Sequence, residues 1–263
     1  MRVLEWLNRS NLLLALSAAF LVAHSYIILG CYVHIVEMAC ACFLTWCAYL
    51  FLKQNHGRLQ RIFICIAITG VILSFAYTDS AFKAGAFAAG CLVLAYSTHW
   101  LQSILKRPVK FSLRSRGWIK PICITTAWCL LCTVPAVYSC EWATGDRRML
   151  LIISDFMLIA GLAIASDLRD AEHDTGHITT LPIKYSARLV RLCCALLFIA
   201  SSTAEALLFS TLSTGAAITM GALVLSSLAL LFFKPLTSRR PLHTALIDAF
   251  LCIRFAVPFA DFF

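Results

Sequence analysis

The most regular feature of this sequence is a series of long apolar stretches separated by short polar segments. Each stretch reaches or approaches the ~17–25 residues that a helix needs to cross the hydrocarbon core of a bilayer. Nine such stretches occur, at residues 12–29, 35–52, 60–77, 81–99, 119–138, 149–166, 187–209, 214–233 and 242–262. The pattern predicts an all-α polytopic membrane protein, a bundle of nine transmembrane helices around a central cavity. Residues 1–263 are expected to form a single domain without an internal repeat.

The composition agrees with this pattern. Hydrophobic residues make up 61% of the 263 positions and charged residues 13%, whereas soluble proteins average about 45–50% and about 25%. The chain is therefore predicted to be an integral membrane protein. Its first apolar stretch is interpreted as a retained helix, because no small-residue cleavage site of a signal peptide follows it.

The net charge of +9 would suggest nucleic acid or another acidic partner in a soluble chain. In a membrane protein, the distribution of the basic residues among the loops indicates the orientation of the chain. With nine spans, 18 of the 22 Lys and Arg residues fall before the first span or after the second, fourth, sixth and eighth. The positive-inside rule then places the N-terminus and these loops in the cytoplasm and the C-terminus outside. We expect a bacterial inner (cell) membrane location and no nucleic-acid partner.

A cluster of acids stands at the cytoplasmic end of the sixth span. If the helix continues to residue 174, Asp167, Asp170 and Asp174 occupy positions i, i+3 and i+7 of one face. Three carboxylates on one stripe favour a hard divalent cation bound through oxygen ligands. A solvated loop that caps the next helix explains the same residues equally well, and both interpretations stay open on spacing alone.

The basic loops around this cluster narrow its chemistry. Carboxylates together with nearby Lys and Arg suit a diphosphate, because Mg²⁺ usually takes one or two carboxylates plus substrate phosphates. A diphosphate at the mouth of an apolar bundle suggests a tail buried in the membrane. A polyprenyl diphosphate is therefore the expected substrate.

Several motifs resemble those of the UbiA-type superfamily of intramembrane prenyltransferases. The segment after the sixth span is similar to the family's second aspartate motif, and reads Asp167-Leu168-Arg169-Asp170, three further residues, Asp174, Gly176 and Thr180-Leu181-Pro182. Weaker similarities lie at Tyr96-Ser97 with Lys106-Arg107, and at Trp118-Ile119-Lys120, which opens a span containing Trp128 and Pro135.

The resemblance implies Mg²⁺-dependent transfer of a prenyl group from a polyprenyl diphosphate to an aromatic or other small, lipid-forming acceptor in the membrane. It implies that Asp167, Asp170 and Asp174 are the catalytic residues and the metal ligands. The residues expected to bind the diphosphate are Lys120, Arg114, Lys184 and Tyr96. Aromatic side chains such as Trp118 and Trp128 either shield a carbocation or belong to the interfacial aromatic belt.

The chain departs from the family at the first aspartate-rich motif, which lies at the cytoplasmic end of the second helix. Residues 45–56 contain no acid, and Leu50 and Leu52 stand about where a polar residue and an aspartate are expected. A catalytically degenerate relative that binds an isoprenoid lipid is therefore the main alternative. A transporter is a third hypothesis, although acids gathered at one mouth are less typical of transporters than acids at the midplane.

Other polar residues lie inside the apolar stretches, where an unpaired acid costs about 2.5–3.5 kcal/mol on insertion scales. These acids are Glu37, Asp155, Glu205 and Asp248. Arg254 in the last span is a candidate partner for one of them. Asp248 resembles an aspartate found in the ninth helix of some members of the UbiA-type superfamily, and the resemblance implies that it can reach the cavity. Structural pairing and a role in the site are equally open for each acid.

The cysteines are interpreted as packing residues, and two histidines are considered as a zinc pair. Ten of the 13 cysteines lie in apolar runs and are interpreted as packing residues, namely Cys40, Cys42, Cys47, Cys65, Cys91, Cys129, Cys132, Cys193, Cys194 and Cys252. His173 and His177 have the i, i+4 spacing of a zinc pair. The helix is expected to end between them, which disfavours that interpretation.

Overall fold

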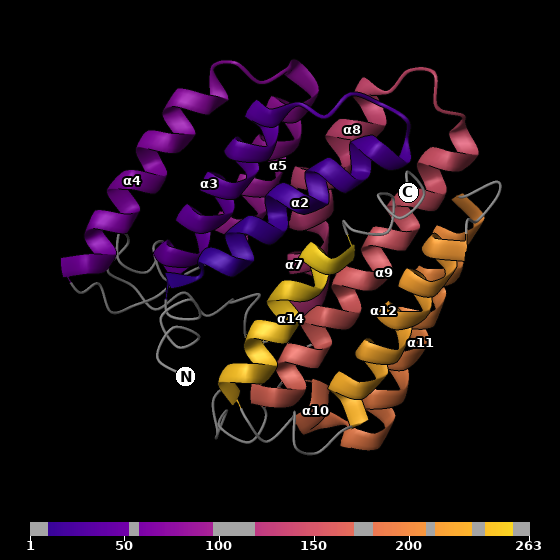
Figure 1. Ribbon diagram of the computed structural model, residues 1–263. Coiled ribbons are helices and arrows are strands. Elements are labelled where there is room, and N and C mark those ends of the chain that lie inside the picture. Colours follow the sequence, from indigo (N-terminus) through magenta and orange to yellow (C-terminus); the bar gives the residue numbers. More distant parts are fainter. Residues whose placement is uncertain are drawn as a thin grey trace.

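The computed structural model describes residues 10–52, 58–96, 119–170, 181–208, 214–232 and 240–254, which form helices and the short turns between them (Figure 1). The helices are α2 (Leu12–Ile28), α3 (Ile35–Leu52), α4 (Arg58–Phe75), α5 (Ser80–Tyr96), α7 (Ile119–Trp128), η2 (Cys129–Thr133), α8 (Val134–Ser139), α9 (Gly145–Asp170), α10 (Leu181–Lys184), α11 (Ala187–Leu208), α12 (Thr214–Phe232) and α14 (Arg240–Arg254). α7, η2 and α8 form one continuous rod, and α10 is a single turn. The remaining helices and this rod match the apolar stretches one by one, which confirms the predicted all-α polytopic fold.

Helix length agrees with a membrane location. In the described part of the chain, four helices are long and apolar enough to cross a bilayer, at Ile35–Leu52, Ile119–Ser139, Gly145–Leu168 and Ala187–Leu208. Three shorter apolar helices cover Leu12–Ile28, Gln60–Phe75 and Ser80–Tyr96. The sixth predicted span was too short, because α9 begins at Gly145 and continues to Asp170. The helix thus carries both Asp167 and Asp170, whereas Asp174 lies outside the described residues.

The helices pack in two groups that meet at α14. α2 packs along α3 and α3 along α4, while α9 packs along α11 and α11 along α12. α14 contacts both α2 and α9, and Figure 1 shows it in yellow between the two groups. This central position brings residues from the two ends of the chain to one site.

The rod formed by α7, η2 and α8 contains a π-helical segment that is in contact with α9. Pro135 has no amide hydrogen, so the regular i−4 ladder cannot continue through it, and the wider turn Cys129–Thr133 ends two residues before it. The hydroxyl of Thr133 donates to Oδ2 of Asp155 at 2.7 Å. On the other side of the rod, a Cβ added at Gly85 of α5 would lie 2.3 Å from the carbonyl oxygen of Leu130. Glycine therefore permits this close helix contact.

A disulfide between Cys31 and Cys140 joins the end of α2 to the end of α8. Gly30 ends α2 with a φ of 75°, and the amide of Cys31 donates to the carbonyl of Tyr26 at 2.9 Å, as in a Schellman motif. The ten cysteines assigned to packing are free thiols. Three of them face outward rather than into the core, Cys65, Cys91 and Cys193.

Candidate active site

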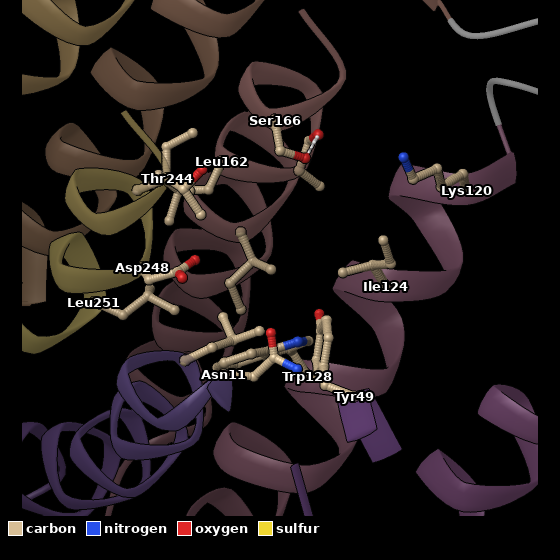
Figure 2. A pocket seen from close by; sticks show the side chains of 14 residues that line it. Asn11, Tyr49, Lys120, Ile124, Trp128, Leu162, Ser166, Thr244, Asp248 and Leu251 are labelled. Atoms are coloured by element: carbon tan, nitrogen blue, oxygen red, sulfur yellow. Dashed lines mark hydrogen bonds between the residues drawn. The ribbon is translucent and has the colours of Figure 1, made fainter. Parts of the chain in front are cut away.

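A cavity of about 280 Å³ lies between α2, α3, α7, α9 and α14 (Figure 2). Most of its wall is apolar, and Trp128 and Tyr49 contribute aromatic rings. Small-molecule sites typically have this character, a concave apolar wall with a few polar groups that orient the ligand. The polar residues that line this cavity are Asn11, Tyr49, Lys120, Ser166, Thr244 and Asp248.

An ion pair stands beside the cavity, where α7 begins and α9 ends. Nζ of Lys120 donates to Oδ1 of Asp167. The Asp167 side chain is fully buried, whereas the Lys120 side chain keeps 24% of its surface exposed. Lys120 also lines the cavity. The structure therefore brings together two residues that the sequence motifs assigned to one site.

Helix stability does not explain where these two charges stand. Lys120 lies in the first turn of α7 and Asp167 in the last turn of α9. Helix dipoles favour acids near N-termini and bases near C-termini, so each residue stands at the less favourable end of its helix. The pair offsets this disadvantage, because each charge lies next to its opposite. A buried carboxylate held at an unfavourable helix end is more typical of a site than of a stabilising surface bridge.

The carboxylates near the cavity can be compared with the needs of Mg²⁺. Asp167 carries a carboxylate, the ligand type that Mg²⁺ prefers, and Asp170 lies one turn further along α9 on the same face. The described residues contain no group of three or more His, Cys, Asp or Glu side chains that could hold a metal ion. The side chain of Asp170, and the whole of Asp174, lie outside that description. Asp167 is thus the one carboxylate described at this end of α9, and a divalent ion there would need further oxygen ligands, such as phosphate oxygens.

The facing end of α3 offers no carboxylate. Tyr49 lines the cavity there, while Leu50 is 1% exposed and packs with Ala15, Trp46 and Ala67 in a separate apolar cluster. Leu50 thus serves the packing of α3 against α2 and α4. The sequence indicated that no acid stands at this position, and the folded chain likewise places no carboxylate there.

The other predicted diphosphate ligands are not gathered at this cavity in the described chain. Lys184 lies exposed on α10, with its Nζ 5.4 Å from the centre of the Tyr185 ring. Tyr96 is the last residue of α5, and neither residue lines the cavity. Arg114 and Trp118 lie outside the described residues, as do His173 and His177. Their roles stay predictions.

Two polar residues of the cavity differ in their sequence signal. Asp248 was expected to reach the cavity from its resemblance to a family aspartate, and it does line the cavity together with Thr244. Asn11 was missed. Its only signal is a polar Ser10-Asn11 pair directly before the first apolar stretch, which reads as an ordinary helix start.

A second charged group lies deeper in the bundle, centred on Arg254 of α14. Its guanidinium, 1% exposed, pairs with Oδ1 of Asp155 at 2.9 Å and with Oε2 of Glu205 at 2.9 Å. It also donates to the hydroxyl of Ser154 at 2.6 Å. The prediction that Arg254 partners an intramembrane acid is confirmed, and the residue bridges two acids rather than one.

This group extends to α2 and to the π-helical segment. Nε2 of His24 lies 2.8 Å from Oε1 of Glu205, and Asp155 accepts the hydrogen bond from Thr133. We call Arg254, Asp155, Glu205, His24 and Thr133 the buried ionic cluster. Its members come from α2, η2, α9, α11 and α14, so it links both helix groups.

The buried ionic cluster begins about one helical turn beyond the cavity. Ile159 lines the cavity, and Asp155 is one turn away along α9; Leu251 lines the cavity, and Arg254 follows it one turn later along α14. The apolar wall between them separates two charged regions. The buried ionic cluster therefore lies next to the cavity on this side, behind the apolar side chains of Ile159 and Leu251.

Comparison with known proteins supports the fold of the chain. No protein-family model matches the sequence, and no curated protein matches it. The chain is similar to a solved structure of digeranylgeranylglyceryl phosphate synthase, and the two structures align with a TM-score of 0.53. The match covers 99% of this chain and 97% of that one at 14% sequence identity. At this identity the likeness shows a shared fold over the whole chain.

Proposed function

We propose that this chain is an Mg²⁺-dependent prenyltransferase of the membrane, which transfers a prenyl group from a polyprenyl diphosphate to a small acceptor. The observation that carries the proposal is the buried Asp167 held beside Lys120 at the edge of an apolar cavity. The fold shared with a membrane synthase of a prenylated lipid supports it. The resemblance of the segment around Asp167 to the UbiA-type second aspartate motif supports it independently.

In this proposal each side chain has a defined task. Lys120 exchanges its bond with Asp167 for a bond to the diphosphate, which it holds as a point charge. Asp167, with Asp170 and Asp174, provides oxygen ligands on the α9 side. Mg²⁺ bound there would offset the negative charge that develops on the leaving diphosphate. The apolar wall excludes water, which would otherwise capture the reactive carbon.

The reaction replaces one bond with another at the allylic carbon. The bond between that carbon and the diphosphate oxygen breaks, and its electron pair leaves with the diphosphate. The acceptor then supplies the electron pair for the new bond and releases a proton. Trp128 lines the cavity and can stabilise the positive carbon through its ring face.

We place the Lys120 side of the cavity at the cytoplasmic face of a bacterial inner membrane. The distribution of basic loops supports this orientation. Lys120 lies at the start of the rod formed by α7, η2 and α8, and the Cys31–Cys140 disulfide lies at the opposite end of this rod. Since disulfides persist in oxidising compartments, a disulfide at that end supports the same orientation.

The proposal is tested with a radiolabelled prenyl diphosphate and purified protein in lipid nanodiscs, with Mg²⁺ or with EDTA. Wild type is expected to release diphosphate and transfer label only with Mg²⁺, and Asp167→Asn to lose at least about 99% of this activity. Asp146→Asn is the matched control, because Asp146 lies on the same helix in its first turn. Equal activity in Asp167→Asn and wild type would overturn the assignment of the site.

A second candidate is a catalytically inactive protein that binds an isoprenoid. The acid-free end of α3 favours it, because Tyr49 lines the cavity there and Leu50 packs against α2 and α4. This candidate predicts that prenyl diphosphate stabilises the protein against heat while no label is transferred under any condition. Transfer of label in wild type would exclude it.

A further inference from the structure

Three of the helices that line the cavity do so over segments of similar length. The lining residues fall within residues 120–128 of α7, 159–166 of α9 and 244–251 of α14. At a rise of about 1.5 Å per residue, each segment is about 10–12 Å long. Figure 2 shows Lys120 at one end of the α7 wall and Trp128 at the other, with Ile124 between them. The cavity therefore has a similar depth along three of its walls.

Beyond this depth, the same three walls continue into the buried ionic cluster. Asp155 lies one turn beyond Ile159 on α9, and Arg254 lies one turn beyond Leu251 on α14. The rod that contains α7 contributes Thr133, whose hydroxyl donates to Asp155 at 2.7 Å. Each wall is thus followed within about one or two turns by a member of the cluster.

This charged layer resists the entry of an apolar tail. The Arg254 guanidinium, 1% exposed, pairs at 2.9 Å with both Asp155 and Glu205. A hydrocarbon chain pushed into this layer would separate the pairs and leave buried charges without their partners, which is strongly unfavourable. Ile159 and Leu251, each 3% exposed, are the last apolar side chains before this layer on α9 and α14 that line the cavity. We call these two residues the floor of the cavity.

The contact between α2 and α14 lies at the same depth as the floor. The hydroxyl of Ser17 on α2 donates to the backbone carbonyl of Asp248 and lies 3.3 Å from Sγ of Cys252. Leu251 stands between these two positions of α14. Because the two helices are joined beside the floor, a path between them toward the lipid is disfavoured for a tail that reaches this depth.

We propose that the cavity accepts prenyl tails of only two to three isoprene units and that Ile159 and Leu251 set this limit. The inference rests on the proposed function, which places the diphosphate beside Lys120. An isoprene unit adds four chain bonds and about 5 Å when extended. Two units therefore need about 10 Å and four about 20 Å, against a cavity depth of about 10–12 Å.

The test compares tail lengths in binding, without turnover. The probes are geranyl, farnesyl and geranylgeranyl S-thiolodiphosphates, whose carbon–sulfur bond resists cleavage, and each competes with radiolabelled geranyl probe on protein in nanodiscs. Affinities are expressed per mole fraction of probe in the lipid, so that partitioning alone gives longer tails no advantage. Wild type is expected to bind the geranylgeranyl probe at least about tenfold more weakly than the geranyl probe, because the fourth unit has no space.

A variant of the floor moves the limit by one unit. Ile159→Ala with Leu251→Ala removes about six carbon atoms, against about five in an isoprene unit. This variant is expected to bind the geranylgeranyl probe at least about tenfold more tightly than wild type does, with less than about a threefold change for the geranyl probe. Each single substitution is expected to give an intermediate gain, which keeps the test valid if the double variant does not fold.

The matched control makes the same two kinds of substitution on outward-facing positions. Ile153→Ala with Leu225→Ala removes equal volume from side chains that are 38% and 70% exposed. The control is expected to retain the wild-type preference for short tails. Thermal unfolding of both variants checks that the fold is retained.

The outcomes separate this limit from the proposed function. Equal or tighter binding of the geranylgeranyl probe in wild type overturns the limit, because the tail must then leave the cavity sideways. An unchanged preference in the folded floor variants overturns the assignment to Ile159 and Leu251. If short tails are preferred but no label is transferred from geranyl diphosphate, the limit stands and the proposed function fails. If geranylgeranyl is transferred as efficiently as geranyl, the function stands and the limit is wrong.

Discussion

The two ion pairs on α9 differ in how completely they are surrounded. Asp155 and Asp167 are both fully buried and lie about three turns apart on one helix. The partner of Asp155 is Arg254, which is 1% exposed and also holds Glu205 and Ser154. The partner of Asp167 is Lys120, which keeps a quarter of its side chain exposed and lines the cavity. One pair is enclosed by protein, and the other borders an open space.

This difference indicates different roles. Arg254 presents a rigid planar donor group that can satisfy several acceptors at once, whereas a lysine ammonium is a mobile point charge. Removing one partner of an enclosed ion pair leaves a buried charge without its counter-charge, which is strongly destabilising. A lysine at a cavity can exchange one anion for another at small cost. We therefore propose that the buried ionic cluster stabilises the fold and that the Lys120–Asp167 pair takes part in the proposed chemistry.

The largest effect is expected from Arg254→Met. The substitution leaves Asp155 and Glu205 as buried acids without their cation, which typically costs about 3–5 kcal/mol. Thermal unfolding in detergent should show a strongly lowered midpoint or no folded protein. Replacing Arg254, Asp155 and Glu205 together with Met, Leu and Leu should restore much of the stability, because apolar groups can replace a buried ion network. Wild-type stability of the single variant would contradict the structural role.

A smaller change in stability but a large change in activity is expected from Lys120→Met. Without its charge on the diphosphate, prenyl transfer should fall about a hundredfold or more. The unfolding midpoint should shift much less than in Arg254→Met. Lys83→Met is the control, because Lys83 lies in the first turn of α5 away from the cavity. A Lys120→Met enzyme that keeps its rate but loses its fold would reverse the assignment.

Removing the disulfide tests whether the end opposite the cavity affects the chemistry. Cys31→Ser with Cys140→Ser should lower stability by about 2 kcal/mol, because the crosslink restricts the unfolded chain. Prenyl transfer at low temperature should not change. Cys91→Ser, at an exposed free thiol, should alter neither quantity. A large loss of activity in the double variant would show that the two ends are coupled.

The smallest effect is expected from Tyr26→Phe. The hydroxyl of Tyr26 donates to Glu37 at 2.5 Å, and its loss should cost about 1 kcal/mol. The unfolding midpoint measures this change. Tyr138→Phe is the matched control and should have no effect, because Tyr138 is 70% exposed. Equal midpoints for Tyr26→Phe and wild type would show that the bond contributes nothing to stability.

The features that were predictable from the sequence depend either on patterns that extend over many residues or on a residue type that is rare in its surroundings. Apolar stretches of membrane length predict helices because no other local structure suits them. Arg254 was predictable as a partner because it is a rare cation inside a span. The motifs around Asp167 and Lys120 assigned both residues to one site, and the structure places them in contact; their role in chemistry stays a prediction.

The features that were missed depend on contacts between distant segments. The Cys31–Cys140 bond joins residues 109 positions apart, and no local pattern indicates such a pairing. Asn11 gains its significance from the cavity that α14 completes. The bridging of two acids by Arg254 required α9, α11 and α14 to meet. Each feature becomes visible only when the helices are packed.

The most direct test of the central claim is photo-crosslinking with a radiolabelled, photoreactive prenyl diphosphate in nanodiscs, followed by mapping of the labelled peptides. The account predicts label on α7, on the Ile159–Asp170 part of α9 or on α14, and predicts that unlabelled prenyl diphosphate competes it away. It also predicts that Lys120→Met reduces this labelling, whereas Lys83→Met does not. Competed label confined to α4 or α12, with the cavity residues unlabelled, would contradict the account.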